Sequence, residues 1–137
     1  MPLTFHPTTG HVLICDYPKD LKPPEMVKRR PVIVVSPKLK NRNNLVTIVP
    51  LSTTTPAHIM PFHYQIHLPS PLPDPWNASS CWAICDHPMT VSFARLNLIR
   101  LPKDQYGKRR YFKYRIGEED QNGIKSALLA AFGIFMD

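Results

Sequence analysis

The sequence predicts a mainly β fold, a small barrel of short strands closed by one C-terminal helix. Sixteen prolines are spread along the 137 residues, and because proline lacks a backbone N–H and resists helix interiors, the chain must consist of short strands and loops. Apolar runs of strand length separate these prolines, and only the tail has helical periodicity. With 43% apolar residues, the chain can build one hydrophobic core but not two, so we expect residues 1–137 to form a single domain.

Three strands are predicted in the first half of the chain. Residues 10–17 form a short apolar run between a glycine and a proline. Residues 31–36 (PVIVVS) give the strongest strand signal, because consecutive β-branched residues favour a buried, pleated environment. Residues 45–51 form the third run. A proline-rich charged loop follows the first run, and a basic turn separates the other two.

Further strands are predicted in the second half. In residues 62–68 the histidines alternate with apolar residues, which places the histidines on the solvated face. Residues 70–80 contain too many prolines to pair regularly and form a long loop, and residues 80–86 return to a buried strand. Short segments follow, and then a strand from Gly107 whose apolar side chains alternate with basic ones.

The tail is predicted to be an amphipathic helix. Its apolar residues recur three or four positions apart, which places them on one face. That stripe consists of Ile124, Ala127, Leu128, Ala131, Phe132 and Phe135. Glu118, Glu119 and Asp120 lie in the expected first turn, where negative charge complements the helix dipole.

Composition limits the classes of partner and location. Lys and Arg total 17 against 10 for Asp and Glu, and the net charge of +7 attracts polyanions such as RNA, DNA, an acidic protein or an anionic membrane. The sequence has neither an apolar run of about 18 residues nor a signal-peptide pattern, so we expect a cytoplasmic protein without membrane association.

The cysteines are predicted to be buried thiols. Cys15, Cys81 and Cys85 are odd in number and lie inside apolar segments, which argues against a disulfide framework. Together with His87, the last two have a spacing that fits no zinc pattern with a matching second pair. We therefore expect no metal and no cofactor.

The order of several short motifs resembles the MazF/PemK/Kid toxin family over nearly the whole chain. The motifs are Gly10-His11-Val12, Glu25, Arg30-Pro31 leading into a strand that ends at Ser36, Val49 to Thr54, Asp86 to Leu96, and the tail helix. The five-residue step from Glu25 to Arg30 also matches the family. Two departures, the proline-rich insertion at 70–75 and a basic strand near 108–115, bear on cleavage sequence and partner.

The resemblance implies an SH3-like barrel of the MazF/CcdB type with a C-terminal α-helix. It also implies a homodimer, the toxin component of a type II toxin–antitoxin system, and a metal-independent endoribonuclease that cleaves single-stranded mRNA as an mRNA interferase. A cognate antitoxin whose acidic or apolar tail covers the RNA groove is implied as partner.

Metal-free RNA cleavage of this kind uses the neighbouring 2′-hydroxyl as nucleophile and leaves a 2′,3′-cyclic phosphate and a 5′-hydroxyl. Arg30 suits charge neutralisation, because its guanidinium is permanently charged and binds two phosphate oxygens. The family gives the matching arginine an acid role as well, but its high pKa favours electrostatic stabilisation. Ser52 or Thr53, with Thr53 favoured, would donate a hydroxyl, and Glu25 would accept a proton or position Arg30. The alternative interpretation of Arg30 and Glu25 is solvated surface charge.

RNA binding is expected to depend on basic and aromatic side chains. Phosphate contacts are assigned to Lys28, Arg29, Lys38, Lys40 and Arg42. Trp76, in the long loop, is the candidate for base stacking, whereas Trp82 and Phe93 are assigned to the core. Arg95 either binds phosphate or braces the barrel by pairing with Asp86. His63 and His67 are alternative acid–base groups if Arg30 has no such role, and His87 is assigned a structural role.

Two other functions remain compatible with the sequence. A non-catalytic toxin on the same barrel would inhibit DNA gyrase, as related CcdB-type proteins do, through the end of the helix at residues 133–135. A basic SH3-like module would bind RNA without cleaving it. RNA cleavage that disappears with Arg30→Ala would distinguish the first hypothesis from both.

Overall fold

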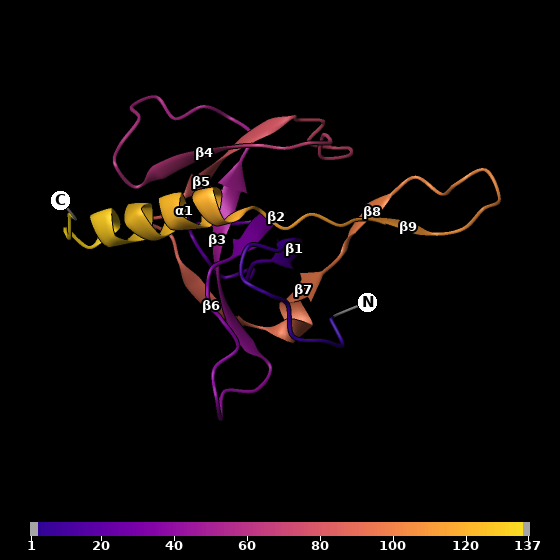
Figure 1. Cartoon of the computed structure of the whole chain (residues 1–137), viewed down its shortest axis with the longest axis horizontal. Coiled ribbons are helices and arrows are strands. Elements are labelled where there is room, and N and C mark those ends of the chain that lie inside the picture. The colour runs from indigo at the N-terminus through magenta and orange to yellow at the C-terminus, as the bar shows by residue number, and fades with distance from the viewer. Residues whose placement is uncertain (1–2, 136–137) are drawn as a thin grey trace.

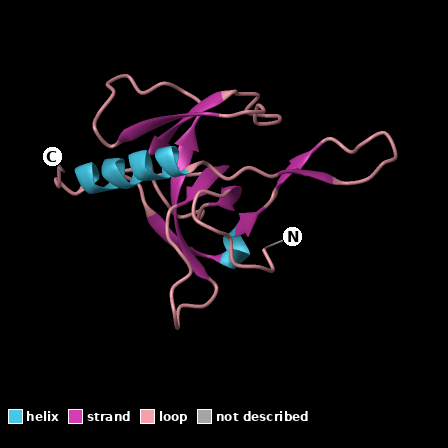
Figure 2. Ribbon diagram, viewed as in Figure 1, coloured by secondary structure: helices cyan, strands magenta, loops and turns pink. Residues whose placement is uncertain are grey.

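The computed structural model describes residues 3–135 and is mainly β, with one long helix near the C-terminus (Figures 1 and 2). The strands are β1 (Val12–Asp16), β2 (Arg29–Val34), β3 (Leu45–Ser52), β4 (His63–His67), β5 (Ser80–Ile84), β6 (Met89–Ser92), β7 (Leu96–Asn97), β8 (Ile99–Leu101) and β9 (Arg110–Phe112). A 3₁₀ turn, Phe93–Arg95, precedes β7, and the helix α1 is Glu118–Ala131. The predicted fold class, strands first and helix last, is confirmed.

The strands β1 to β7 form one antiparallel sheet in the order β4-β5-β3-β2-β1-β7, with β6 also paired to β3. The strand β3 connects its two halves. On one side it pairs with β2, and on the other its first half pairs with β6 and its last two residues with β5. This division turns the sheet around β3 and gives a small coiled sheet rather than a flat one.

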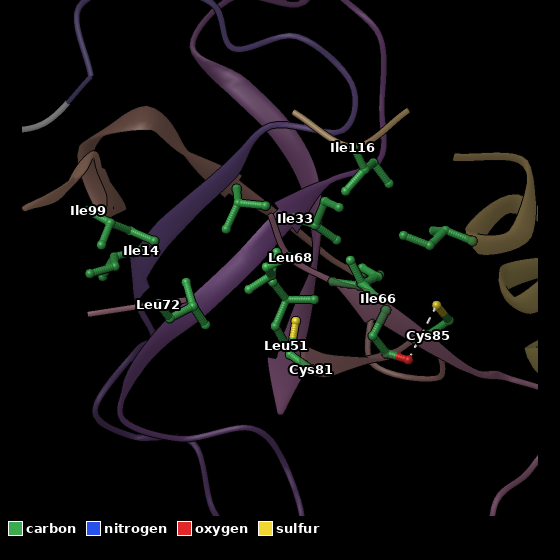
Figure 3. Packing of buried hydrophobic residues seen from close by; sticks show 14 of the residues in the cluster. Ile14, Ile33, Leu51, Ile66, Leu68, Leu72, Cys81, Cys85, Ile99 and Ile116 are labelled. Carbon is green, nitrogen blue, oxygen red and sulfur yellow. Dashed lines mark hydrogen bonds between the residues drawn. The ribbon is translucent and has the colours of Figure 1, made fainter. Parts of the chain in front are cut away.

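Two hydrophobic clusters fill opposite faces of this sheet. The first lies on the face that α1 covers, and it contains Ile33 of β2, Leu51 of β3 and Ile66 of β4 (Figure 3). The second contains Leu13, Val32 and Ile48. Because side chains alternate along a strand, residues 30, 32 and 34 of β2 face the second cluster. We call that face of the sheet the site face.

The helix ends earlier than the apolar stripe predicted. Ile124 and Ala127 are buried against the first cluster, but Phe132 and Phe135 are 70% and 68% exposed. Gly133 has a positive φ of 77°, and its N–H and that of Ile134 bond to the last helical carbonyls. This left-handed cap ends the helix, so the last positions of the stripe do not reach the core.

The hairpin β8–β9 projects away from the sheet (Figure 1). Its base is fixed by Ile99 and Phe112, which lie opposite each other in the register and are buried in the first cluster. Arg100 and Tyr111 form the neighbouring pair and therefore point to the other face of the hairpin. The predicted alternation of apolar and basic residues in this region is confirmed for Phe112 and Ile116, both buried.

The three cysteines are buried and free, as predicted. Burial raises the pKa of each thiol, to about 12 in every case. Neutral thiols of this kind pack as small apolar groups and are poor nucleophiles and metal ligands. Over residues 3–135, no helix is both long and apolar enough to span a bilayer.

Candidate functional site

Several predicted site residues meet where strands of the central sheet end. Antiparallel pairing brings the last residue of β1 beside the first of β2, since Asp16 lies opposite Arg29. Their side chains form an ion pair of 3.1 Å. Arg30 follows, and Arg95 approaches from the turn before β7, where it donates to the Asp16 carbonyl at 3.4 Å. We call this cluster of Arg29, Arg30 and Arg95 the arginine edge.

A row of side chains crosses the sheet at the arginine edge on the site face. In the β2–β3 register Val32 lies opposite Pro50, and continuation by two residues places Arg30 opposite Ser52. Ser52 in turn lies opposite Trp82 of β5, and Trp82 lies opposite Gln65 of β4. Residues directly opposite in antiparallel strands point to the same face, and neighbouring strands are about 4.8 Å apart. A cation, a hydroxyl and a half-buried aromatic ring therefore stand side by side.

The guanidinium of Arg30 is held by the loop that precedes β2. Its Nε and Nη2 both donate to the carbonyl of Val27, at 3.2 and 2.8 Å. A guanidinium has five N–H donors, so three remain for a ligand. The contact also fixes the loop, because one side chain binds its backbone twice.

The hydroxyl of Ser52 forms a tight local turn. Its Oγ accepts from the N–H of Thr54 at 3.2 Å and donates to the carbonyl of the same residue at 3.1 Å. Thr53 is exposed and lies beyond the end of β3. The register thus brings Ser52 to Arg30, although the sequence favoured Thr53.

Glu25 lies in the loop between β1 and β2, where its carboxylate accepts from the N–H of Lys22 at 3.1 Å. With Tyr17, Asp86 and His87 it lines a hollow of about 350 Å³. Arg30 and Ser52 do not line this hollow, but Tyr17, which does, is close to the guanidinium of Arg30. Burial raises the pKa of Tyr17, and the nearby guanidinium of Arg30 partly opposes that shift. The phenol is neutral at physiological pH and its hydroxyl is buried without a partner in the described chain.

The predicted phosphate contacts divide into two groups. Lys28 and Arg29 directly precede Arg30 and are exposed at the arginine edge. Lys38, Lys40 and Arg42 lie in the loop from β2 to β3, which is at the opposite end of both strands. The structure therefore does not bring this second group to Arg30. Arg42 binds the Ser36 hydroxyl at 3.1 Å and has a local structural role.

The pairing of Arg95 with Asp86 is wrong. Arg95 bonds to the backbone of Asp16, and the carboxylate of Asp86 lies 3.8 Å from the ring of His87. The turn between β5 and β6 places Asp86 with Tyr17, Glu25 and His87 in the lining of the hollow of about 350 Å³. Arg95 consequently belongs to the arginine edge, where the phosphate-binding alternative stays open.

Both tryptophans are half-buried, but they pack differently from the prediction. Trp76 packs against the first hydrophobic cluster, whereas Trp82 belongs to neither cluster and is half-buried beside Ser52. The signal was the alternation with Cys81 and Ala83, which are both buried. The run CWAIC is apolar throughout, so the alternation of buried and half-buried positions could not be recognised in the sequence.

His63 and His67 lie two residues to either side of Gln65 on β4 and therefore share its face of the sheet. His67 is exposed on β4, and His63 packs edge-on against Phe62 while its Nδ1 accepts from the N–H of Met60 at 3.0 Å. Within residues 3–135, no three His, Cys, Asp or Glu side chains are grouped in a way that could hold a metal ion.

The fold and the arginine edge define a small β protein with a charged strand end suited to a phosphate backbone. The family model described as the PemK-like, MazF-like toxin of type II toxin–antitoxin systems matches residues 8–129. The chain belongs to this toxin family. No curated protein matches the sequence.

Solved structures of similar fold carry related names. An endoribonuclease in complex with its cognate antitoxin, from a mycobacterial species, has a TM-score of 0.62 and 21% identity, with 96% of this chain and 100% of that chain covered. MazF from Deinococcus radiodurans has a TM-score of 0.62 and 18% identity, covering 95% and 99%. The Mycobacterium tuberculosis toxin MazF-mt6 has a TM-score of 0.59 and 16% identity, covering 91% and 98%. At these identities the likeness establishes the fold.

Proposed function

We propose that this toxin-family protein is an endoribonuclease that cleaves single-stranded mRNA without a metal ion. The pairing of Ser52 with Trp82, together with the β2–β3 register that continues from Pro50 and Val32 toward Ser52 and Arg30, is the observation that carries the proposal. A cation, a hydroxyl donor and an aromatic ring are what a phosphodiester and its base require. Membership of the toxin family and the fold shared with an endoribonuclease support the same conclusion.

In the proposed reaction the 2′-hydroxyl oxygen attacks the adjacent phosphorus while its proton leaves. The bond from phosphorus to the 5′-oxygen breaks, and that oxygen takes up a proton. The products are a 2′,3′-cyclic phosphate and a free 5′-hydroxyl. Negative charge accumulates on the phosphoryl oxygens in between, and fixed donors stabilise it without reorganisation.

Arg30 provides the charge and two directed N–H groups in this reaction. Its guanidinium stays protonated throughout, so electrostatic stabilisation is its role. The hydroxyl of Ser52, one strand away, donates to the same phosphoryl oxygen once it leaves the Thr54 carbonyl. The permanent positive charge of Arg30 supplies what a metal ion supplies in other nucleases.

Glu25 is the proposed acceptor of the 2′-hydroxyl proton. It is exposed, its carboxylate accepts one backbone N–H, that of Lys22, and Arg30 fixes the other end of its loop. Substrate binding at Arg30 competes with the Val27 carbonyl, and releasing that hydrogen bond frees the loop that carries Glu25.

Two partners complete the proposal. A cognate antitoxin would inhibit the toxin by covering the arginine edge with an acidic or apolar segment, which the +7 charge favours. A homodimer is proposed as the assembled state, and the exposed Phe132, Ile134 and Phe135 supply apolar surface for association.

The decisive experiment is sequencing of RNA 5′-hydroxyl ends after brief expression of the wild type and of Arg30→Ala. We expect discrete cleavage sites in single-stranded mRNA for the wild type, and a loss of at least about 10²-fold in cleavage rate for the variant. The purified protein should cleave equally well with and without EDTA.

Arg30→Lys is the control for charge alone, since lysine keeps the charge but not the paired donors, and it should recover only part of the rate. Growth arrest that persists in Arg30→Ala would indicate a gyrase-type toxin. RNA that is retained but uncut by the wild type would indicate a binding module. Either result, or loss of cleavage in EDTA, would overturn the proposal.

A further inference from the structure

The hairpin β8–β9 and its flanks contain the largest group of cations that the proposed reaction does not use. Seven basic residues lie between positions 99 and 115, namely Arg100, Lys103, Lys108, Arg109, Arg110, Lys113 and Arg115. The acidic residue in this segment is Asp104, and its carboxylate accepts the backbone N–H groups of Tyr106 and Lys108 at 2.8 and 2.9 Å. Asp104 thus shapes the turn and leaves the cationic heads to solvent.

A hollow lies where the hairpin meets the sheet. It has a volume of about 480 Å³ and is lined by Leu3, Phe5, Arg29, Asn97, Arg100 and Tyr111, among others. We call it the hairpin hollow. Its volume is within the range of small-ligand sites, about 300–1,000 Å³. Its lining combines two guanidiniums, an amide and aromatic rings, which match a phosphate, a base edge and a base face respectively.

The geometry of the hairpin presents these groups rigidly. Ile99 and Phe112 bury one face of its base, so Arg100 and Tyr111, on the other face, point to the hollow together. The hollow also reaches the arginine edge directly. Arg29 lines it and is the residue next to Arg30, on the opposite face of β2. The ion pair with Asp16 holds Arg29 in this position.

We propose that the hairpin hollow and the cationic arm beyond it bind single-stranded RNA that flanks the scissile bond. This inference rests on the proposed function, because the scissile phosphate at Arg30 sets where the flanking strand begins. One nucleotide occupies the hollow, with its phosphate on Arg29 and Arg100 and its base against Tyr111. The strand then follows the arm, where Lys103, Lys108 and Arg109 are exposed and Tyr106, at its tip, is 85% exposed.

Two observations favour RNA over an acidic protein segment as the ligand of the hairpin hollow and the arm. The cations alternate with tyrosines along the hairpin, and aromatic rings between cations suit stacked bases. Apart from Tyr106 and Phe5, which are both aromatic, the exposed large apolar side chains lie elsewhere, with Phe132, Ile134 and Phe135 beyond α1. The hairpin surface is therefore cationic and aromatic, unlike the apolar core of a protein interface.

The test compares two lengths of RNA. One is a minimal oligonucleotide around a cleaved bond, and the other extends it by about ten nucleotides on each side. Binding is measured by fluorescence anisotropy with 2′-O-methyl RNA, which cannot supply the nucleophile, and cleavage is measured with ordinary RNA. The variants are Arg100→Gln/Tyr111→Ala in the hollow and Lys108→Glu on the arm. Lys125→Glu, at an exposed position of α1, is the matched control for net charge.

We expect both hairpin variants to bind the long RNA about tenfold more weakly, with a salt dependence lowered by about 0.7 in slope for each phosphate that is no longer bound. Cleavage of the minimal RNA should match the wild type, which also shows that the variants are folded. Lys125→Glu should leave both lengths unaffected.

The inference is overturned if the hairpin variants bind the long RNA with wild-type affinity. The same holds if their affinity for RNA is unchanged and they lose binding to a protein partner. It is also overturned if they weaken both lengths equally or if Lys125→Glu has the same effect. Failure of the wild type to cleave either RNA would refute the proposed function, so the two failures are distinguishable.

Discussion

At the scale of single residues, position on the pleated sheet decides which of two similar side chains belongs to the site. Ser52 and Thr53 are adjacent hydroxyls, but only Ser52 lies within β3, and the β2–β3 register continued by two residues leads from it to Arg30. Trp82 and Trp76 differ in the same way, since Trp82 lies opposite Ser52 and Trp76 packs on the core. The chemistry of a residue type is therefore insufficient to assign its role.

Ser52→Ala and Thr53→Ala form a matched pair for this claim. Loss of the Ser52 hydroxyl should lower kcat by about 10²-fold, the usual effect of removing one transition-state donor. Thr53→Ala should stay within about threefold, because that side chain lies past the strand end. Single-turnover cleavage of a mapped RNA separates the two, and equal losses, or a larger loss for Thr53, would contradict the register.

Trp82→Ala should raise KM for RNA by about tenfold or more, the value of one base–aromatic stack, with little change in stability. Trp82→Phe should retain most of the affinity. Trp76→Ala is predicted to behave oppositely, with a lower free energy of unfolding and an ordinary KM, because this ring packs on the first cluster. RNA titrations and urea unfolding of all three variants test the assignment, and an unchanged KM for Trp82→Ala refutes it.

At the scale of elements, the helix packs on the first cluster through Ile124 and Ala127 and also approaches β4 closely at Tyr64. The hydroxyl of Tyr64, on β4, donates to the carboxylate of Asp120 in the first helical turn at 2.7 Å. This bond raises the pKa of the tyrosine to about 12. One turn later, Gly123 leaves room for the same ring, and a Cβ added there would overlap its Cε1 and Cζ.

Gly123→Ala should destabilise the protein by about 1–3 kcal/mol, although alanine has the better helix propensity by about 1 kcal/mol. The added methyl group must displace a tyrosine ring whose hydroxyl is already bonded. Asn122→Ala, at an exposed position of the same helix, is the control and should be neutral or slightly stabilising. Urea unfolding of the two variants measures the difference. A Gly123→Ala protein as stable as the control would show that α1 does not pack on Tyr64.

The sequence was sufficient for elements with strong local patterns and insufficient where distant segments meet. Residues 31–36 and the acidic start of the helix carry their structure in their own residue types: the strand is found at Arg29–Val34, two residues earlier than predicted, and the acidic first turn is confirmed. The end of the helix depends on the left-handed Gly133, which the stripe of apolar residues does not reveal. The separation of Lys38 and Lys40 from Arg30 follows from strand direction, a property of the assembled sheet.

At the scale of the whole molecule, the chain is closed by contacts between its beginning and the segment that leads into the helix. The N–H of Val12 donates to the carbonyl of Tyr114, and that of Ile116 to the carbonyl of Gly10. Gly10 also donates to Val34 of β2. His11 lies at the centre of this junction and pairs with Arg115 as an isolated bridge. The site, the hairpin and the helix all depend on it for their relative positions.

Because His11 is embedded among cations, this junction should make folding sensitive to mild acid. Burial lowers the pKa of His11, and the neighbouring Arg115 lowers it further. His11, Lys113 and Arg115 together line a small surface hollow, so both cations lie near the imidazole ring. The unfolded chain takes up a proton near pH 6.5 that the folded chain binds only at lower pH, so stability is complete above about pH 6.5 and falls as the pH drops below it. The net charge of +7 adds general repulsion in the same direction.

Thermal unfolding between pH 7.5 and pH 5.5 measures this effect, since in that window a free imidazole, as in the unfolded chain, gains a proton while free carboxyl groups stay ionised. We expect the wild-type Tm to fall by about 2–4 °C over the window. In a chain of this size, that is the shift expected when the unfolded state binds a fraction of one proton more than the folded state. His11→Gln should remove most of the fall, because glutamine fills similar space without titrating. His67→Gln, at an exposed position of β4, should retain it. An equal fall in all three proteins would assign the acid sensitivity to overall charge and not to the junction at His11.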